Sequence, residues 1–147
     1  MRLEWTRDLE TGVGAIDDDH RLIIEFYNRI YHHYTIGADI LVLERAIADF
    51  RLLFSLHCLR EENFMIEVGY PDFESHAREH ETMIRLLDTF IEDQVERAVS
   101  CQRIAFLVLQ WLSSHLEGAD RRLAGFAKQP VLVRESAIQR MGHKAHY

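Results

Sequence analysis

The chain has 147 residues, of which 48% are hydrophobic and 28% charged, and its formal net charge is -7. This length suits one domain with a full hydrophobic core, and the negative charge argues against nucleic acid and anionic membranes as partners. The sequence has no apolar run of membrane-spanning length, no secretory signal and only two cysteines, so we expect a reduced, cytoplasmic protein and a monomer.

The chain begins with an expected irregular arm over residues 1–16, which contains Gly12 and Gly14. Asp17 has a side chain suited to capping a helix, and we predict a first helix over about 17–34. Its apolar residues recur at helical spacing, which gives the helix one inner face. That face comprises Ile16, His20, Ile23, Ile24, Tyr27, Ile30 and Tyr31.

A second helix is predicted from the cap residue Asp39 to about Val68, because Gly37 and Ala38 form a turn before it. The sequence Gly69-Tyr70-Pro71-Asp72 then combines a helix-ending glycine with a proline suited to a helix start. A third helix is expected over about 73–95. A fourth is expected over about 100–127, with Ser100 as its cap.

Four long helices with short connections predict an all-α, antiparallel, up-down-up-down four-helix bundle with an N-terminal arm and a short C-terminal extension. We assign residues 1–128 to this bundle. Residues 129–147 form the extension, for which a short helix around 135–141 is expected.

Each predicted helix carries metal-ligand residue types on its apolar face, where unsatisfied polar groups are costly. Taken singly, each is explained by a core histidine or a local side-chain pair. Together, the antiparallel order brings all of them to one end of the bundle. The seven candidate ligands are His20, His57, Glu61, His76, His80, His115 and Asp120.

Five imidazoles and two carboxylates suit two iron ions. Two octahedral ions offer twelve coordination positions. If Glu61, Asp120 and one solvent-derived oxygen each bridge both ions, these bridges fill six positions and the histidines fill five. One position stays open for a small ligand such as O2, and the same count predicts that an anion such as azide binds there.

The order of the motifs resembles that of the bacterial hemerythrins over about residues 5–125. The similar segments are Trp5-Thr6 through His20, the block His57-x-x-x-Glu61 to His76-x-x-x-His80, and Trp111-Leu112-x-x-His115-x-x-x-x-Asp120. The resemblance implies a hydroxo- or oxo-bridged di-iron centre that binds O2 reversibly. It also implies that His76, His80 and His115 hold the saturated iron, whereas His20 and His57 hold the iron that faces O2.

Three further residues are candidates for the O2 pocket. Trp111 and Leu112 lie one turn before His115, although a purely core role predicts the same residues. Cys58 stands where this family usually has phenylalanine, and it is either a small packing residue or an oxidisable thiol near the pocket. Glu62 follows a ligand but points off the inner face, so we expect it at the surface.

The spacing between His115 and Asp120 is five residues, which in a straight α-helix separates the two side chains by roughly 140°. Two explanations stay open. Either a π-bulge around Gly118 realigns them, or the helix is regular and Asp120 reaches sideways.

The resemblance implies O2 storage, delivery or sensing, and we expect a binding protein and not an enzyme. Five neutral imidazoles with two anions favour the ferrous state, which supports reversible binding. The same seven ligands also fit two alternatives, a di-iron peroxidase or oxidase and an iron-handling protein.

Overall fold

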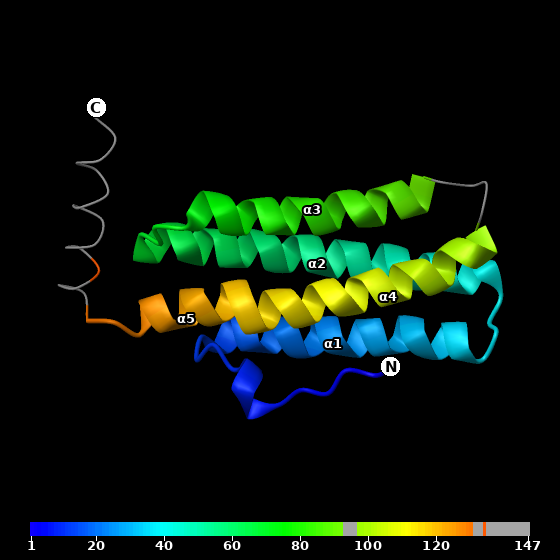
Figure 1. Cartoon of the computed structure of the whole chain (residues 1–147), viewed down its shortest axis with the longest axis horizontal. Helices are drawn as coiled ribbons and strands as arrows, with labels where there is room; N and C mark the ends of the chain where they lie inside the picture. Colours follow the sequence, from blue (N-terminus) through cyan, green and yellow to red (C-terminus); the bar gives the residue numbers. More distant parts are fainter. Residues whose placement is uncertain (93–96, 131–133, 135–147) are drawn as a thin grey trace.

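The computed structural model describes residues 1–92, 97–130 and 134, and for 97–102 the backbone alone. Its four long helices are α1 (Gly14–Thr35), α2 (Ile40–Val68), α3 (Phe73–Glu92) and α4 (Arg97–His115). The helix α4 continues through a π-helical segment, η2 (Leu116–Asp120), into α5 (Arg121–Ala127). Figure 1 shows the helices packed side by side in alternating directions, so the predicted all-α four-helix bundle is confirmed.

Both predicted turns at the ends of α2 are confirmed. The side chain of Asp39 accepts a hydrogen bond of 2.8 Å from the backbone N–H of Leu41, which caps the start of α2. Gly69 ends the helix in the left-handed conformation, with φ of 66°, and the N–H of Tyr70 bonds back to the Met65 carbonyl. These two turns set the ends of α2 and reverse the chain on either side of it.

The predicted start of the first helix was wrong. α1 begins at Gly14, and Asp17 lies inside it with its backbone N–H bonded to the Val13 carbonyl. The Asp17 carboxylate instead accepts hydrogen bonds from the backbone and hydroxyl of Thr11 (2.7 and 2.8 Å) and from the N–H of Gly12 (3.1 Å). The Asp17 side chain therefore holds the arm against α1 and does not cap the helix.

The N-terminal arm lies along α1 (Figure 1) and contains one short 3-10 turn, η1 (Arg7–Leu9). Leu3 and the side chain of Asn28 exchange two hydrogen bonds of 2.9 and 2.8 Å. The hydroxyl of Tyr27 donates to the Met1 carbonyl at 2.9 Å. The arm is thereby fixed to the bundle by its backbone.

The fourth helix begins earlier than expected, at Arg97, three residues before the predicted cap Ser100. The expected end of the third helix near residue 95 and the short helix expected at 135–141 both lie outside the described residues. Among the described helices, none is both long and apolar enough to cross a membrane.

The bundle core consists of two apolar clusters. The larger one contains Phe50, Phe54 and Leu112 among many others, and it fills the middle of the bundle and the end at the α1–α2 turn. The smaller one contains Met65, Tyr70, Leu123 and Phe126 and closes the opposite end. Along α2, the candidate ligands fall between the two clusters, so both sides of the candidate site are dry.

Candidate metal centre

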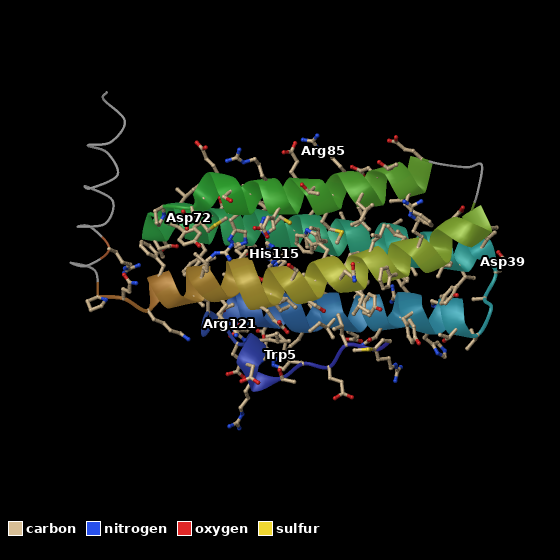
Figure 2. All side chains as sticks on the ribbon, in the orientation of Figure 1. Trp5, Asp39, Asp72, Arg85, His115 and Arg121 are labelled. Carbon is tan, nitrogen blue, oxygen red and sulfur yellow. The ribbon has the colours of Figure 1, made fainter. Side chains whose placement is uncertain are left out.

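All seven candidate ligands are buried in the bundle, each with at most 2% of its surface exposed. They come from five elements: His20 from α1, His57 and Glu61 from α2, His76 and His80 from α3, His115 from α4 and Asp120 from η2. Figure 2 labels His115 in the half of the bundle nearer to α5. The described residues thus place every candidate at one level of the bundle.

Two groups of possible metal ligands form within this set. Glu61, His76, His80 and His115 make one group, and His20, His57 and Glu61 make the other. Within each group the ligand atoms all lie within 4.8 Å of one another. The division separates three histidines from two, with Glu61 common to both groups.

Asp120 also reaches both groups. Its Oδ1 lies 3.0 Å from His115 Nε2 and 3.1 Å from His76 Nε2, while its Oδ2 lies 3.3 Å from His20 Nε2. Glu61 Oε2 lies 3.1 Å from His80 Nε2 and 3.6 Å from His57 Nε2. Both carboxylates therefore stand where a bridge between two ions would stand.

The π-helical segment brings Asp120 into this position. Residues Leu116–Asp120 wind as a π-helix, which brings positions five residues apart onto one side of the helix. The predicted bulge is confirmed, and the alternative of a regular helix is excluded. A Cβ added at Gly118 would meet only a side-chain nitrogen of Arg122, at 3.6 Å, so the glycine is not needed for clearance.

The donor set fits metal ions. The Nε2 atoms of His76 and His80 each lie 3.1 Å from that of His115, which matches the separation of about 3.0 Å between neighbouring donors at right angles on an ion about 2.1 Å away. Both oxygens of Glu61, both of Asp120 and both ring nitrogens of His20 are buried without a hydrogen-bond partner among the described residues. Buried polar atoms are otherwise almost always satisfied, so this arrangement indicates missing metal ligation.

Burial and the buried carboxylates oppose each other in this site: burial lowers the pKa of His76 and His115, but Asp120 outweighs it and raises both pKa values. Burial lowers the pKa of His57 to about 3, which keeps that ring neutral and able to coordinate. Burial and the charge of Asp120 work against the charge on Glu61, but the nearby His76 and His80 rings outweigh them and lower the pKa of Glu61 to about 2. The carboxylate therefore stays ionised, as a bridging ligand must.

Two carboxylates outside the ligand set form hydrogen bonds with two of the histidines, at the ring nitrogen that faces away from the site. The Nδ1 of His115 donates to Glu79 at 2.8 Å, and the Nδ1 of His80 donates to Glu62 at 3.1 Å. A carboxylate only accepts, so each contact puts the ring proton on Nδ1 and turns the Nε2 lone pair towards the site. Glu62 was expected at the surface; it is partly buried instead, because it reaches His80 on α3.

Glu79 was not identified from the sequence. It lies on α3 between the two ligand histidines, but its partner His115 is 36 residues away on another helix. The only sequence signal was an acidic residue beside two histidines, which also describes a solvated helix face.

Aromatic rings line one side of the site. Trp111 stacks on His115 with ring centroids 4.2 Å apart and planes inclined by 16°, and it meets Phe54 edge-on at 5.1 Å. Leu112 and Cys58 both lie in the larger core cluster, at 1% and 3% exposure. Burial raises the pKa of the Cys58 thiol, so the thiol stays protonated.

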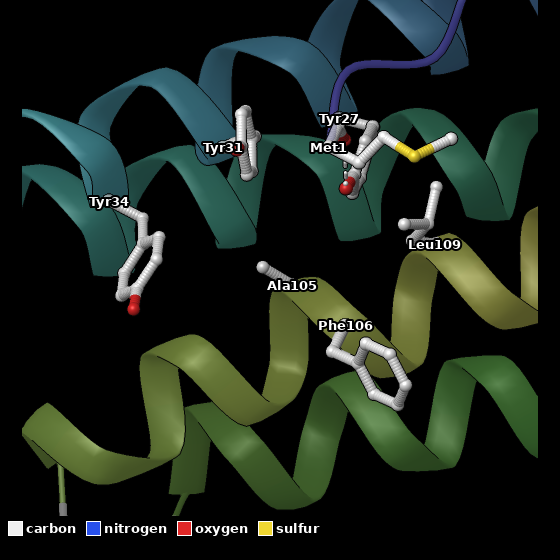
Figure 3. A pocket seen from close by; sticks show the side chains of 7 residues that line it. All are labelled: Met1, Tyr27, Tyr31, Tyr34, Ala105, Phe106 and Leu109. Atoms are coloured by element: carbon white, nitrogen blue, oxygen red, sulfur yellow. Dashed lines mark hydrogen bonds between the residues drawn. The ribbon is translucent and has the colours of Figure 1, made fainter.

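A separate hollow of about 250 Å3 lies between α1 and α4, towards the opposite end of the bundle (Figure 3). Three tyrosines, Ala105, Phe106, Leu109 and Met1 line it. It offers phenol hydroxyls but no histidine or carboxylate among its lining residues, so it has no metal-ligand set.

Comparison with known proteins identifies related chains. The model of the hemerythrin HHE cation-binding domain matches residues 11–127. The bacteriohemerythrin of Stenotrophomonas maltophilia is 31% identical over 129 residues, which cover 86% of this chain and 82% of that protein. The hemerythrin of Phascolopsis gouldii is 27% identical over 123 residues, covering 82% and 90% of the two chains.

Proposed function

The chain belongs to the hemerythrin family, and we propose that it binds O2 reversibly at a non-haem di-iron centre. The observation that carries this proposal is the division of the buried ligands into a group with three histidines and a group with two, with both carboxylates reaching each group. Two unequal groups suit two ions with different numbers of protein ligands.

His76, His80 and His115 would hold one iron, and His20 and His57 the other, with Glu61 and Asp120 between them. When bound, an oxo- or hydroxo-bridged pair of irons supplies two electrons that O2 can accept and return. Because His20 and His57 supply only two nitrogens, an ion held there would have a position left for a small ligand. A small anion such as azide would occupy the same position in the oxidised protein.

The chain itself orients the ligands and keeps water away. Glu79 and Glu62 fix the ring orientation of His115 and His80 through their Nδ1 protons. Trp111 and Phe54 cover the histidines on one side, while the cluster around Met65 and Leu123 closes the end of the bundle. A site that excludes water limits the proton leakage that promotes irreversible oxidation, which favours reversible binding.

The balance of ligand charge supports a carrier over an enzyme. Five neutral imidazoles and two carboxylates stabilise reduced iron better than the four carboxylates and two histidines of ferritin-like sites. Peroxidase or oxidase chemistry and iron handling are the competing functions, because they use the same ligands. Whether the protein stores, delivers or senses O2 depends on partners outside this chain.

One experiment separates these functions. The protein is loaded with ferrous iron, exposed to air, and followed by visible spectroscopy during repeated cycles of oxygenation and deoxygenation. We expect an absorption band that appears with O2 and disappears under argon over many cycles. Irreversible conversion to the ferric form within one cycle would reject reversible binding and favour an enzyme.

A further inference from the structure

The outward face of α2 carries a row of exposed side chains, most of which are aliphatic. We call this row the α2 stripe. Its five large aliphatic side chains are each between 46% and 66% exposed. The stripe consists of eight exposed positions, spaced by three or four residues so that they follow one line along the helix: Leu41, Arg45, Ala48, Leu52, Leu56, Leu59, Asn63 and Ile66.

The outward face of α3 differs sharply from that of α2. It presents Glu74, Arg78, Glu81, Arg85 and Thr89 to solvent, which is the pattern of a helix with one buried and one solvated side. Six of the eight positions in the α2 stripe are aliphatic instead. A helix that is apolar on its outer side as well as its inner side is normally covered on both.

We propose that the α2 stripe is the interface of a homodimer, in which α2 of a second copy packs antiparallel across it. The stripe is self-complementary when its direction is reversed. With a two-fold axis between Leu52 and Leu56, these two residues face each other, Ala48 faces Leu59, and Leu41 faces Ile66. In the same arrangement, Arg45 of one copy faces Asn63 of the other.

Charge favours the antiparallel direction. Asp49 and Arg60 lie at the edge of α2 that faces α1, where Asp49 binds Arg29 at 3.1 Å and Arg60 binds Asp19. In the antiparallel dimer, the Asp49 of one copy lies beside the Arg60 of the other, and the symmetry repeats this contact.

A parallel pair would instead place Arg45 against Arg45 in the middle of the interface, and it would keep the Asp49 of one copy away from the Arg60 of the other because the α1 edges would lie on opposite sides. Like charges in register are destabilising. At the opposite edge, Glu62 is turned towards His80 of α3.

The dimensions suit a helix. From Leu41 to Ile66 the stripe extends about 38 Å, and a face about 10 Å wide gives a patch of about 400 Å2, within the range of the largest apolar patch on a typical soluble protein, which is often functional. Ile91 of α3 and Leu22 of α1 are also exposed and can extend the contact. A shallow groove of about 500 Å3 between Leu41, Ala48 and Ile91 lies where the second copy's Leu59 and Ile66 would pack.

This proposal replaces the monomer expected from the sequence, and it does not depend on the proposed O2 binding. Sedimentation equilibrium of the full chain tests it. We expect a mass twice the single-chain 17.3 kDa for the wild type, and the single-chain mass for the variant Leu52→Glu/Leu59→Glu. Phe106→Glu, which changes an exposed apolar residue on α4 to the same acid, should remain a dimer.

Both substituted leucines are exposed, so the helical content and bound metal of the variant should equal those of the wild type. A wild type with the single-chain mass at every concentration would overturn the proposal. So would a dimer that persists in Leu52→Glu/Leu59→Glu. A single-chain mass with the stripe bound to a different protein also counts against self-association.

Cysteine cross-linking tests the direction. The variant Ala48→Cys/Leu59→Cys should form a covalent dimer on mild oxidation, because the antiparallel register brings these positions close enough for a disulfide, about 5.5–6 Å between Cα atoms. Within one chain they are eleven residues apart and cannot join. Ala48→Cys alone should give no covalent dimer, and efficient cross-linking of that single variant would reject the antiparallel arrangement.

Discussion

Glu79 of α3 accepts a hydrogen bond of 2.8 Å from Nδ1 of His115 on α4. The contact joins the two helices at the level of the ligands and decides which nitrogen of His115 faces the site. Glu62 does the same for His80 at 3.1 Å. In the group with two histidines, Nδ1 of His20 and of His57 lacks such a partner among the described residues. The supporting carboxylates therefore favour one group of ligands over the other.

Replacing Glu79 by glutamine should weaken metal binding. The amide removes the negative charge that makes the His115 ring a stronger ligand, and losses of about 10–100-fold in metal affinity are typical for such changes. Competition against a chelator measures the effect. Glu81→Gln, the same substitution two residues along α3 at an exposed position, is the control and should leave the affinity unchanged.

Loss of a ligand should lower the iron content. His57 belongs to the group with only two histidines, and Glu61 belongs to both groups, so His57→Ala and Glu61→Ala should each retain fewer than two irons per chain. Elemental analysis of the purified variants measures this. His32→Ala, at the exposed far end of α1, should keep the wild-type content. Two irons in both ligand variants would refute the assignment.

Removal of the metal should destabilise the bundle. Several buried nitrogen and oxygen atoms of the ligands have no hydrogen-bond partner among the described residues, so without metal they would remain unsatisfied in the core. We expect a lower melting temperature for the chelated protein than for the loaded one. Equal melting temperatures for the two forms would contradict metal-dependent stability.

The arrangement of the helices was predictable because it depends on local sequence. The apolar spacing gave the inner faces, while Asp39 and Gly69 mark the ends of α2 through bonds to near neighbours. The five-residue spacing of His115 and Asp120 predicted a π-bulge only on the assumption that both bind metal. The backbone of Leu116–Asp120 is π-helical, which distinguishes the bulge from a regular helix.

Asp17 and Glu62, which were misassigned, and Glu79, which was not identified, have partners that local sequence does not reveal. Asp17 has the side chain of a helix cap, but it bonds backward to the arm at Thr11. Glu62 and Glu79 have the pattern of solvated acids, and only the packing of α3 against α2 and α4 brings them to histidines. The helical spacing of apolar residues predicts only the inner face of α2. The exposed leucines on its outer face do not belong to that spacing.

Stability at high pH should depend on Tyr27. Its buried hydroxyl donates to the Met1 carbonyl at the hollow of Figure 3, and burial raises its pKa from 10.0 to about 12. A group with a raised pKa stabilises the fold below its unfolded pKa and loses this contribution as the pH rises through the folded value. The unfolding free energy should therefore fall between pH 10 and about 12. Denaturant titrations should show a smaller fall for Tyr27→Phe, and an equal fall would contradict the assignment.

The π-helical segment contains one residue more than a regular helix needs, so deleting Gly118 should be tolerated. Deletion brings His115 and Asp120 to a spacing of four, where an α-helix holds them about 40° apart and on the same face. Because a π-bulge accommodates one added residue, Leu123 and Phe126 should keep their phase and their contacts with Met65 and Tyr70. We expect two bound irons and a melting temperature within a few degrees of the wild type.

Deleting Arg122 is the matched control, because α5 has no surplus residue. That deletion turns every later residue by about 100° and moves Leu123 and Phe126 out of their cluster. Each large apolar side chain lost from a core costs about 2–5 kcal/mol, so this variant should melt at a much lower temperature. If the Gly118 deletion lost iron and stability as severely as the Arg122 deletion, the idea that η2 contains one surplus residue would be wrong. The site would then require the π-helical geometry itself.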